Sequence, residues 1–592
     1  MRYILIFLLL CPWSFGSSLE LIDEAYQQGR ISIYDKALLT ATYILDNSSL
    51  PPAFSSPVTQ QRPCATPLLM EVASIMRHAP PAYRSRYQAL KARPSYDGKE
   101  HRFLSSQGHF YIHYTGSGEH APDMTDADMN GVPDQVETMA DLFELSHTTY
   151  HQQLGYLLPP SDGTLGGGQD IYDVYIQNWP GYYGYSMPED YAGDMPEYAT
   201  RSITHIGISN WVTGIYLRGT VAHEYYHACQ MAYYCDYLAY SSWAWDENTA
   251  MYTEELVFPD DDTWLDYTGY RQKHTFFGLW LFDGWTEYCN VIWPLYIREG
   301  LVAYDDTFFR TVFAELGLLT TPQAGGFYPL VLDQQLGSWA GYTLADAYQE
   351  FTLWNYLVKD CYDGTGYEDG ASFNQLPRAH QVLTYQDLPF CGTGDPTYTN
   401  ELPPETFASH YIEIYPEANG PGALLATFTG EAAKNQVWGY SLLCHDRGQP
   451  LTSGWALHDQ GRSHRAGTSH ILLPTPSRFD RVVLIFDNLQ RMEEPTGRTY
   501  SYTVELSNRV QVAAVTPESG SANGGETVTL KGANFDQGTK VWFDKIPAPV
   551  VTVIDDTQVV VQTPAHAPGP ATVVVRTMLH GRIRLPNGFV FY

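Results

Sequence analysis

Hydrophobic positions recur at helical spacing in several stretches of the first two thirds of the chain. The segment IDEAYQQGRISIYDKALLTATYIL (22–45) predicts helix, and so does the segment 136–156, where apolar residues recur at Val136, Met139, Phe143, Tyr150 and Leu154. Alternating runs at 109–114 (HFYIHY) and 171–177 (IYDVYIQ) predict strands in the same region. We therefore expect residues 106–395 to form a mixed α+β body, preceded by a helical and irregular segment, 18–105, that is either a prosegment or an N-terminal subdomain.

The pattern changes after residue 395 to short strands separated by turn residues. The runs at 410–415 (HYIEIY), 481–486 (RVVLIF) and 500–506 (YSYTVEL) predict an all-β sandwich over 396–508. The last segment, 509–592, carries closely spaced strands and glycine turns. Through VTPESG, GGETVTLKGANF, KVWFD and VQTPA it resembles an IPT/TIG domain, which implies an immunoglobulin-like β-sandwich.

The N-terminus MRYILIFLLLCPWSFGSS combines Arg2, a short apolar run and small residues, which is typical of a signal peptide over 1–17. No later segment approaches the roughly 20 apolar residues of a membrane helix. We expect export by this signal, with a secreted, periplasmic or cell-surface location. A lipoprotein at Cys11 is an alternative that the bulky Leu10 disfavours. A formal net charge of -32 without a basic tract argues against nucleic-acid or anionic-lipid partners.

The stretch VAHEYYHACQ (221–230) contains the strongest chemical signal. On a helix His223 and His227 project from one face, so both imidazoles can bind one Zn²⁺, and Glu224 lies beside them to accept a proton from water. Catalytic zinc sites use three protein ligands, and a downstream histidine at position 230 or 233 is ruled out by Gln230 and Tyr233.

A carboxylate in SSWAWDENTAMYTEEL (241–256) is the best third ligand. Glu247 follows His227 after 19 intervening residues, the interval of thermolysin-like gluzincins, while Asp246 at 18 is the main competitor. Glu254, two helical turns beyond Glu247, is either a hydrogen-bond acceptor for a ligand histidine or a solvated carboxylate, and Asp246 is a weaker candidate for that supporting role. Tyr288 is one candidate among several for stabilising the oxyanion.

Three stretches, LRGTVAHEYYHACQMAYY, WAWDENTAMYTEE and EYCNVIWPLYIREG, resemble exported bacterial zinc metallopeptidases of gluzincin type, with similarity over roughly 100–360. The resemblance implies a thermolysin-like α+β body, His223, His227 and Glu247 as zinc ligands, Glu224 as general base, and protein or peptide substrates. The adjacent carboxylates Asp246 and Glu247 leave the choice of third ligand slightly open.

A second metal signal lies at DADMNGVPDQVE (126–137), which fits the twelve-residue calcium loop. Gly131 supplies the sharp turn, and the oxygen ligands would come from Asp126, Asp128, Asn130, Val132 (through its carbonyl), Asp134 and Glu137. No helix is expected to enter the loop, so it would be a single structural Ca²⁺ loop and not a full EF-hand. The alternative is a solvated acidic turn that caps the following helix.

Seven cysteines remain after the signal peptide, without a CxxC pair, and their connectivity cannot be read from the sequence. Cys64, in QRPCATP, suggests a prosegment thiolate that could occupy the fourth zinc position and hold an enzyme latent. A buried thiol or a disulfide partner is the alternative.

Together these patterns favour a secreted zinc metalloendopeptidase in which Glu224 activates water. The competing hypothesis is a surface adhesion or scaffold protein with a vestigial zinc site. The preserved Glu224 argues against the scaffold, because a structural zinc site needs no base. In either case the IPT/TIG-like domain is expected to bind a cell-surface or extracellular ligand.

Overall fold

The computed structural model describes residues 17–592 except 58–60, 97–98, 168–169, 180, 236–239, 320–326, 395–401, 421, 434–435, 465–467 and 491–496. All but the last residue of the expected signal peptide (1–17) lies outside the described residues. The chain divides into two compact units, one of Met1–Tyr270 with Trp280–Leu344 and one of Arg271–Leu279 with Ala345–Tyr592. Within the described residues no helix has the length and apolar character needed to cross a membrane.

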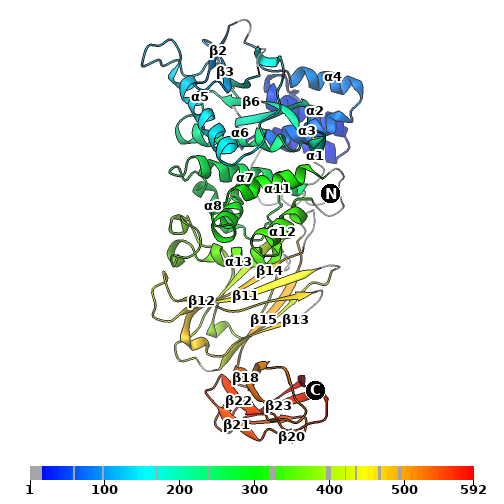
Figure 1. The fold of residues 1–592 in the computed structure, drawn as a ribbon, viewed down its shortest axis with the longest axis vertical. Coiled ribbons are helices and arrows are strands. Elements are labelled where there is room, and N and C mark those ends of the chain that lie inside the picture. The colour runs from blue at the N-terminus through cyan, green and yellow to red at the C-terminus, as the bar shows by residue number, and fades with distance from the viewer. Residues whose placement is uncertain are drawn as a thin grey trace. The chain divides into compact units, whose positions relative to one another are not determined.

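Four helices open the first unit: α1 (Ser18–Gln27), α2 (Ile33–Leu45), α3 (Thr66–Arg77) and α4 (Pro81–Leu90) (Figure 1). The helical pattern over 22–45 is confirmed, with an interruption where Gly29 adopts a φ of 68° and Ser32 begins α2 through a capping box. Apolar side chains of α2, α3 and α4 share a small core of their own, which includes Leu38, Val72 and Tyr87.

A six-stranded mixed sheet forms the centre of this unit, in the order β1-β5-β6-β4-β3-β2. Its strands are β1 (Arg62–Cys64), β2 (Glu100–Leu104), β3 (Phe110–Thr115), β4 (Tyr172–Gln177), β5 (Tyr182–Tyr191) and β6 (Ser202–Ser209). The predicted strands at 109–114 and 171–177 are therefore confirmed as β3 and β4. The predicted helix at 136–156 is α5 (Asp134–His147), which continues as a π-helix over Thr148–Gln153.

Two long helices, α6 (Gly214–Met231) and α7 (Tyr240–Val257), pack on each other, and α6 also packs on β5 and β6 of the sheet. The close approach of α6 to β5 depends on Gly184, where an added Cβ would lie 2.9 Å from Glu224 Cγ and 3.1 Å from the carbonyl oxygen of Gly207. The remaining helices of the first unit surround this pair. They are α8 (Leu265–Lys273, which extends into the second unit), α9 (Thr286–Cys289), α10 (Ile292–Tyr296, continued by a π-helix over Ile297–Leu301), α11 (Thr307–Gly317) and α12 (Phe327–Trp339).

The second unit contains the end of α8 and most of α13 (Leu344–Tyr356), and is otherwise rich in strands. Two sheets, β13-β10-β15-β8 and β12-β11-β14-β9-β7, contribute side chains to one apolar core that includes Trp438, Leu484 and Tyr502. Their strands are β7 (Ala379–Thr384), β8 (Phe390–Thr393), β9 (Ala408–Tyr415), β10 (Ala423–Gly430), β11 (Val437–Asp446), β12 (Trp455–His464), β13 (Thr468–Leu473), β14 (Phe479–Asn488) and β15 (Tyr500–Ser507). The three predicted strand runs are confirmed as β9, β14 and β15.

Residues 511–591 form two further sheets, β16-β18-β22-β21 and β17-β24-β23-β19-β20, around a separate apolar core. Their strands are β16 (Gln511–Thr516), β17 (Ser519–Gly520), β18 (Thr527–Ala533), β19 (Lys540–Phe543), β20 (Ile546–Pro547), β21 (Val550–Val553), β22 (Gln558–Gln562), β23 (Gly569–Arg576) and β24 (Arg582–Phe591). The chain is thus a multidomain α+β protein with a helix-rich N-terminal region and β-sheet C-terminal domains.

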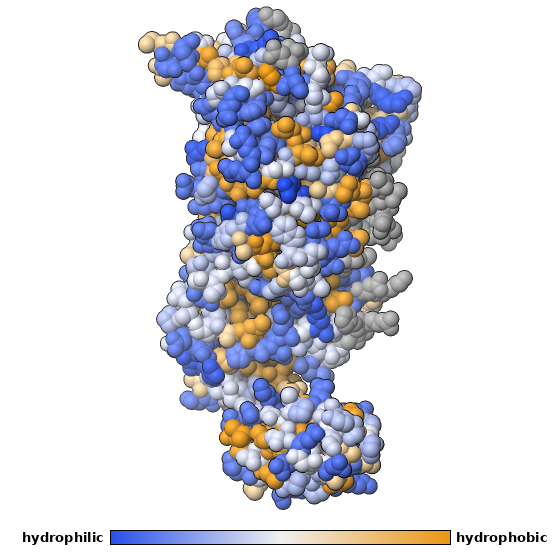
Figure 2. All heavy atoms as spheres, viewed as in Figure 1, coloured by the Kyte–Doolittle hydropathy of each residue, from blue (hydrophilic) through white to orange (hydrophobic). Residues whose placement is uncertain are grey.

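Hydrophobic residues are scattered among hydrophilic ones on the face drawn in Figure 2.

All seven cysteines in the described part of the chain are free thiols, and Cys391 is the exposed one. The seven comprise Cys64, Cys229, Cys235, Cys289, Cys361, Cys391 and Cys444.

Candidate metal centre

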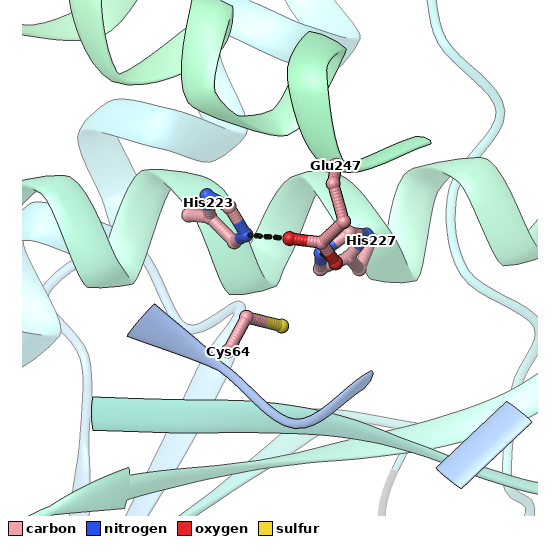
Figure 3. Close-up of side chains that lie close together, drawn as sticks. All are labelled: Cys64, His223, His227 and Glu247. Atoms are coloured by element: carbon pink, nitrogen blue, oxygen red, sulfur yellow. Dashed lines mark ion pairs between the residues drawn. The ribbon is translucent and has the colours of Figure 1, made fainter. Parts of the chain in front are cut away.

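The helix α6 brings His223, Glu224 and His227 into the interior between the sheet and α7. Their side chains are at most 2% exposed. Because the histidines are four residues apart, both rings leave α6 on the same side and their centroids lie 4.8 Å apart. Glu247, on α7, meets them there: its Oε2 lies 3.3 Å from Nε2 of His223, and its Oε1 lies 3.0 Å from Nε2 of His227 (Figure 3).

Cys64 completes this group from β1. In Figure 3, Glu247 enters from one side of α6 and the Cys64 sulfur points in from the other. Ligand atoms of Cys64, His223, His227 and Glu247 all lie within 4.8 Å of one another, and all four residues are buried. The structure therefore places the Cys64 thiol beside the predicted zinc ligands.

Several of these buried atoms have no hydrogen-bond partner among the described residues. They are the Nε2 atoms of both histidines, both carboxylate oxygens of Glu247, and Oε1 of Glu224. Apart from the ion pairs between Glu247 and the two histidines, these buried atoms have no partner, and a cation at the point where they converge would offset the cost of burying them. The donor set of two imidazoles, a carboxylate and a thiol fits a metal ion, so this group could hold one.

The charges around His223 also matter. Burial lowers the pKa of His223, but the carboxylates of Glu247 and Glu254 outweigh it and raise this pKa to about 10. Burial raises the pKa of Glu247, and the two histidines outweigh it and lower this pKa to about 2. The pocket is therefore electrostatically suited to hold positive charge, and a metal ion would displace protons on binding.

Each of the two histidines has a partner for its second ring nitrogen. Nδ1 of His223 lies 3.0 Å from Oε1 of Glu254, whose Oε2 accepts a hydrogen bond from Thr263 at 3.1 Å. Glu254 is buried, so it takes the supporting position considered from the sequence and is not a solvated carboxylate. It reaches His223 across Gly219, where an added Cβ would lie 2.5 Å from Oε2 of Glu254.

His227 is supported by Gln230, which sequence reasoning considered only as a missing ligand. Oε1 of Gln230 lies 2.7 Å from Nδ1 of His227, and Nε2 of Gln230 donates to the backbone carbonyl of Asp246 at 2.9 Å. The carboxylate of Asp246 accepts a hydrogen bond from the Tyr234 hydroxyl at 2.9 Å. Asp246 is thus outside the convergent group, and Glu247 is within it. The signal for Gln230 was its position nearly one turn beyond His227 on the same helix.

One oxygen of Glu224 is held by a hydrogen bond, whereas the other, Oε1, is buried and has no hydrogen-bond partner among the described residues. Its Oε2 accepts a hydrogen bond from the Thr66 hydroxyl at 2.9 Å, and the same hydroxyl oxygen accepts one from the backbone N–H of Ser186 at 2.8 Å. Burial raises the pKa of the Glu224 carboxyl, while the two histidines oppose this shift.

Tyr288, the oxyanion candidate, is buried next to the centre. Its ring centroid lies 6.3 Å from that of His223, and its hydroxyl donates to the backbone carbonyl of Cys64 at 3.3 Å. The pKa of the Cys64 thiol is raised well above its usual range by burial and then by the nearby carboxylates of Glu224 and Glu247.

The acidic loop at 126–137 folds on itself on the surface of the first unit. Carboxylate oxygens of Asp126, Asp128 and Asp134 lie within 4.8 Å of one another. Asn130 Nδ2 donates to Glu137 at 2.8 Å, and the backbone N–H of Val132 donates to Asn130 at 2.8 Å. Gly131 has a φ of 92°, as the predicted turn requires, and α5 begins at Asp134, while no helix enters the loop.

Comparison with known proteins identifies one domain. Residues 511–584 match the IPT/TIG domain, which confirms the resemblance seen in the sequence. No curated protein matches the chain.

Three solved structures show weak likeness to parts of the chain. One is described as the crystal structure of PirA, with 14% identity, 16% of this chain and 92% of that chain covered, and a TM-score of 0.12. The adhesin domain of Epf from Streptococcus pyogenes has 11% identity, with 30% of this chain and 70% of that chain covered, and a TM-score of 0.11. The Spr0440 glycoside hydrolase domain, Endo-D, from Streptococcus pneumoniae R6 has 12% identity over 31% of each chain and a TM-score of 0.11. These TM-scores are too low to bear on fold or function.

Proposed function

We propose that the protein is a secreted zinc metalloendopeptidase. The observation that carries this proposal is the convergence of His223, His227 and Glu247 on one buried point, with the partnerless Glu224 oxygen beside it. Two imidazoles and one carboxylate are a common ligand set for catalytic zinc. A carboxylate directly after the first histidine has no use in a purely structural site.

The roles of the residues follow from their places. Zinc supplies Lewis acidity to water and to the scissile carbonyl when it is bound. Glu224 accepts a proton from water at Oε1 and later delivers it to the leaving amine. Its Oε2 accepts a hydrogen bond from Thr66 in this structure, while Oε1 has no hydrogen-bond partner among the described residues. Tyr288 already donates to a backbone carbonyl beside the centre, the type of group that it would stabilise in a substrate.

Glu254 and Gln230 fix the ring orientation of the two histidines. An acceptor at Nδ1 keeps the proton on that nitrogen, which leaves the lone pair of Nε2 directed at the metal. The proposed site therefore has both its ligands and the groups that orient them.

The test compares wild type with Glu224→Gln. We expect the variant to bind one zinc per chain, by elemental analysis, but to cleave a peptide library about 10²–10⁴-fold more slowly. Because a prosegment is one of the two expectations for 18–105, the other being an N-terminal subdomain, both proteins are assayed before and after limited proteolysis, with and without a chelator. The exposed Glu315→Gln on α11 is the matched control. Undiminished cleavage by Glu224→Gln would exclude this mechanism, and zinc without any cleavage would favour the scaffold alternative.

We also propose that the loop 126–137 binds a structural Ca²⁺, through Asp126, Asp128, Asn130, the Val132 carbonyl, Asp134 and Glu137. The proximity of three carboxylates to one another at the start of α5 supports this. Export by the signal peptide, and a cell-surface or extracellular ligand for the IPT/TIG domain, complete the proposal.

A further inference from the structure

The strand β1 lies at the edge of the central sheet and runs across the candidate metal centre. It pairs with β5 in parallel, with Arg62 opposite Tyr182 and Cys64 opposite Gly184. Backbone N–H groups of Arg62 and Ala65 donate to the carbonyls of Gly181 and Gly184 at 3.0 and 3.1 Å. The segment Arg62–Thr66 is therefore bound as an extended peptide along β5.

This one segment contacts every part of the proposed machinery. The Cys64 thiol lies with the three predicted zinc ligands. Two residues later, the Thr66 hydroxyl holds the proposed general base, Glu224. The carbonyl of Cys64 accepts the hydrogen bond from Tyr288.

Little free space is left beside the segment. Beside it lies a cavity of about 20 Å³, whose lining includes Pro63, His223 and Glu254. A cavity of this size holds about one water molecule, since a water needs roughly 10–15 Å³. A peptide cannot reach the centre while Arg62–Thr66 is in place.

We propose that Arg62–Thr66 is a built-in inhibitory segment, in which the Cys64 thiolate is the fourth ligand of the metal and closes the site to substrate. This rests on the proposed function for the identity of the metal. Four protein ligands make a closed tetrahedral site, whereas catalysis needs one position open to solvent. The thiol proton is released to solvent when sulfur binds the metal. The fourth coordination position becomes open to water when the segment withdraws.

Withdrawal of β1 would leave the strand order of the remaining sheet intact. Because β1 is an edge strand, the pairs β5-β6-β4-β3-β2 do not depend on it. Its departure leaves the backbone groups of β5 unpaired along the same edge, where an extended substrate peptide can add as a strand. The same edge thus serves the inhibitory segment in the latent protein and the substrate in the active one.

The test uses the full chain loaded with Co²⁺, which reports its ligands by absorption. We expect wild type to show a thiolate-to-cobalt charge-transfer band that Cys64→Ala and Cys64→Ser both lose, while each still binds one metal ion per chain. The control is Cys444→Ala, which removes a buried cysteine of the second unit and should keep the band. A band that is absent from wild type, or that persists in Cys64→Ala, would overturn the proposal.

Closure of the site is tested separately from hydrolysis. Azide is small enough to reach the position left by sulfur, so it should change the cobalt spectrum of Cys64→Ala and leave that of wild type unchanged. An unchanged spectrum in Cys64→Ala would refute closure by this segment.

If azide binds as expected, peptide cleavage by the zinc form of Cys64→Ala should rise at least about tenfold over wild type, because a larger fraction of molecules is competent. Azide binding with no cleavage in any variant would support the inhibitory segment and count against the peptidase function.

Discussion

Gln230 and His227 are joined by one hydrogen bond of 2.7 Å, and the amide of Gln230 can point in only one direction. Its NH₂ group donates to the carbonyl of Asp246 and to the hydroxyl of Thr249, at 2.9 and 3.1 Å. Its oxygen is consequently left to face His227, which must carry its proton on Nδ1.

Replacing Gln230 with leucine should therefore weaken zinc binding by about 10–100-fold, the usual effect of losing such a partner. Competition with a chromophoric chelator measures the affinity. Gln436→Leu, an equally buried glutamine in the second unit, should leave it unchanged. Equal zinc affinity in Gln230→Leu and wild type would show that the hydrogen bond does not orient His227.

Calcium should stabilise the first unit through the loop 126–137. At a Ca²⁺ concentration 100 times its Kd, the gain is about 2.7 kcal/mol, seen as a higher Tm than in a calcium chelator. Asp126→Asn should remove most of this gain, because it takes away a charged ligand. Asp141→Asn, exposed on α5 beyond the loop, should retain it. A calcium-dependent rise in Tm that survives in Asp126→Asn would place the ion elsewhere.

Gly184→Ala should destabilise the packing of α6 on β5. The new methyl group would meet Glu224 Cγ at 2.9 Å and the carbonyl of Gly207 at 3.1 Å, and such overpacking costs about 1–3 kcal/mol. Urea unfolding measures the change. Gly337→Ala in α12, where the one neighbour within 4 Å is a carbonyl at 3.9 Å, should be neutral or slightly stabilising. Identical midpoints for the two variants would mean that α6 shifts freely.

Asp487, on β14, should make the β-sandwich less stable as the pH rises. Burial raises the pKa of Asp487 from its ordinary value of 3.8 to about 7, partly opposed by Ser409 and Arg462. Between these values the unfolded chain has released the proton and the folded chain retains it, so the free energy of unfolding falls with increasing pH and levels off above about 7.

Asp487→Asn should remove this dependence. The free energy of unfolding of the variant, relative to that of wild type, should rise by on the order of 4 kcal/mol between pH 4 and pH 7, at about 1.4 kcal/mol for each unit of pKa shift. Hydrogen exchange of β14 peptides, compared between variant and wild type at each pH, measures the gain. The exposed Asp360→Asn serves as control. A stability difference between Asp487→Asn and wild type that stays constant from pH 4 to pH 7 would rule out titration of Asp487.

The sequence predicted what depends on local spacing. The turn of an α-helix places His223 beside His227, so this pair follows from periodicity, whereas Glu247 was predicted from the interval seen in the gluzincins that the chain resembles. The strands of the sandwich and of the IPT/TIG domain likewise follow from alternation. The acidic loop follows from a twelve-residue pattern whose turn requires glycine.

Contacts between distant segments were not predictable in this way. Thr66 and Glu224 are separated by 158 positions, and their hydrogen bond depends on how β1 is aligned with β5. A one-residue slip of that strand would turn Cys64 away from the centre. The sequence therefore suggested the Cys64 thiol as a ligand without deciding between this role and an ordinary buried cysteine.

Gly219 has a consequence for the recognition of related sites in other chains. A methyl group there would lie 2.5 Å from Oε2 of Glu254, so the carboxylate would have to shift from its present place beside His223. A search pattern that requires glycine four residues before the first histidine, together with glutamate seven residues after the third ligand, would select chains in which the second helix supplies this partner. A search for His-Glu-x-x-His alone would not distinguish them from the rest.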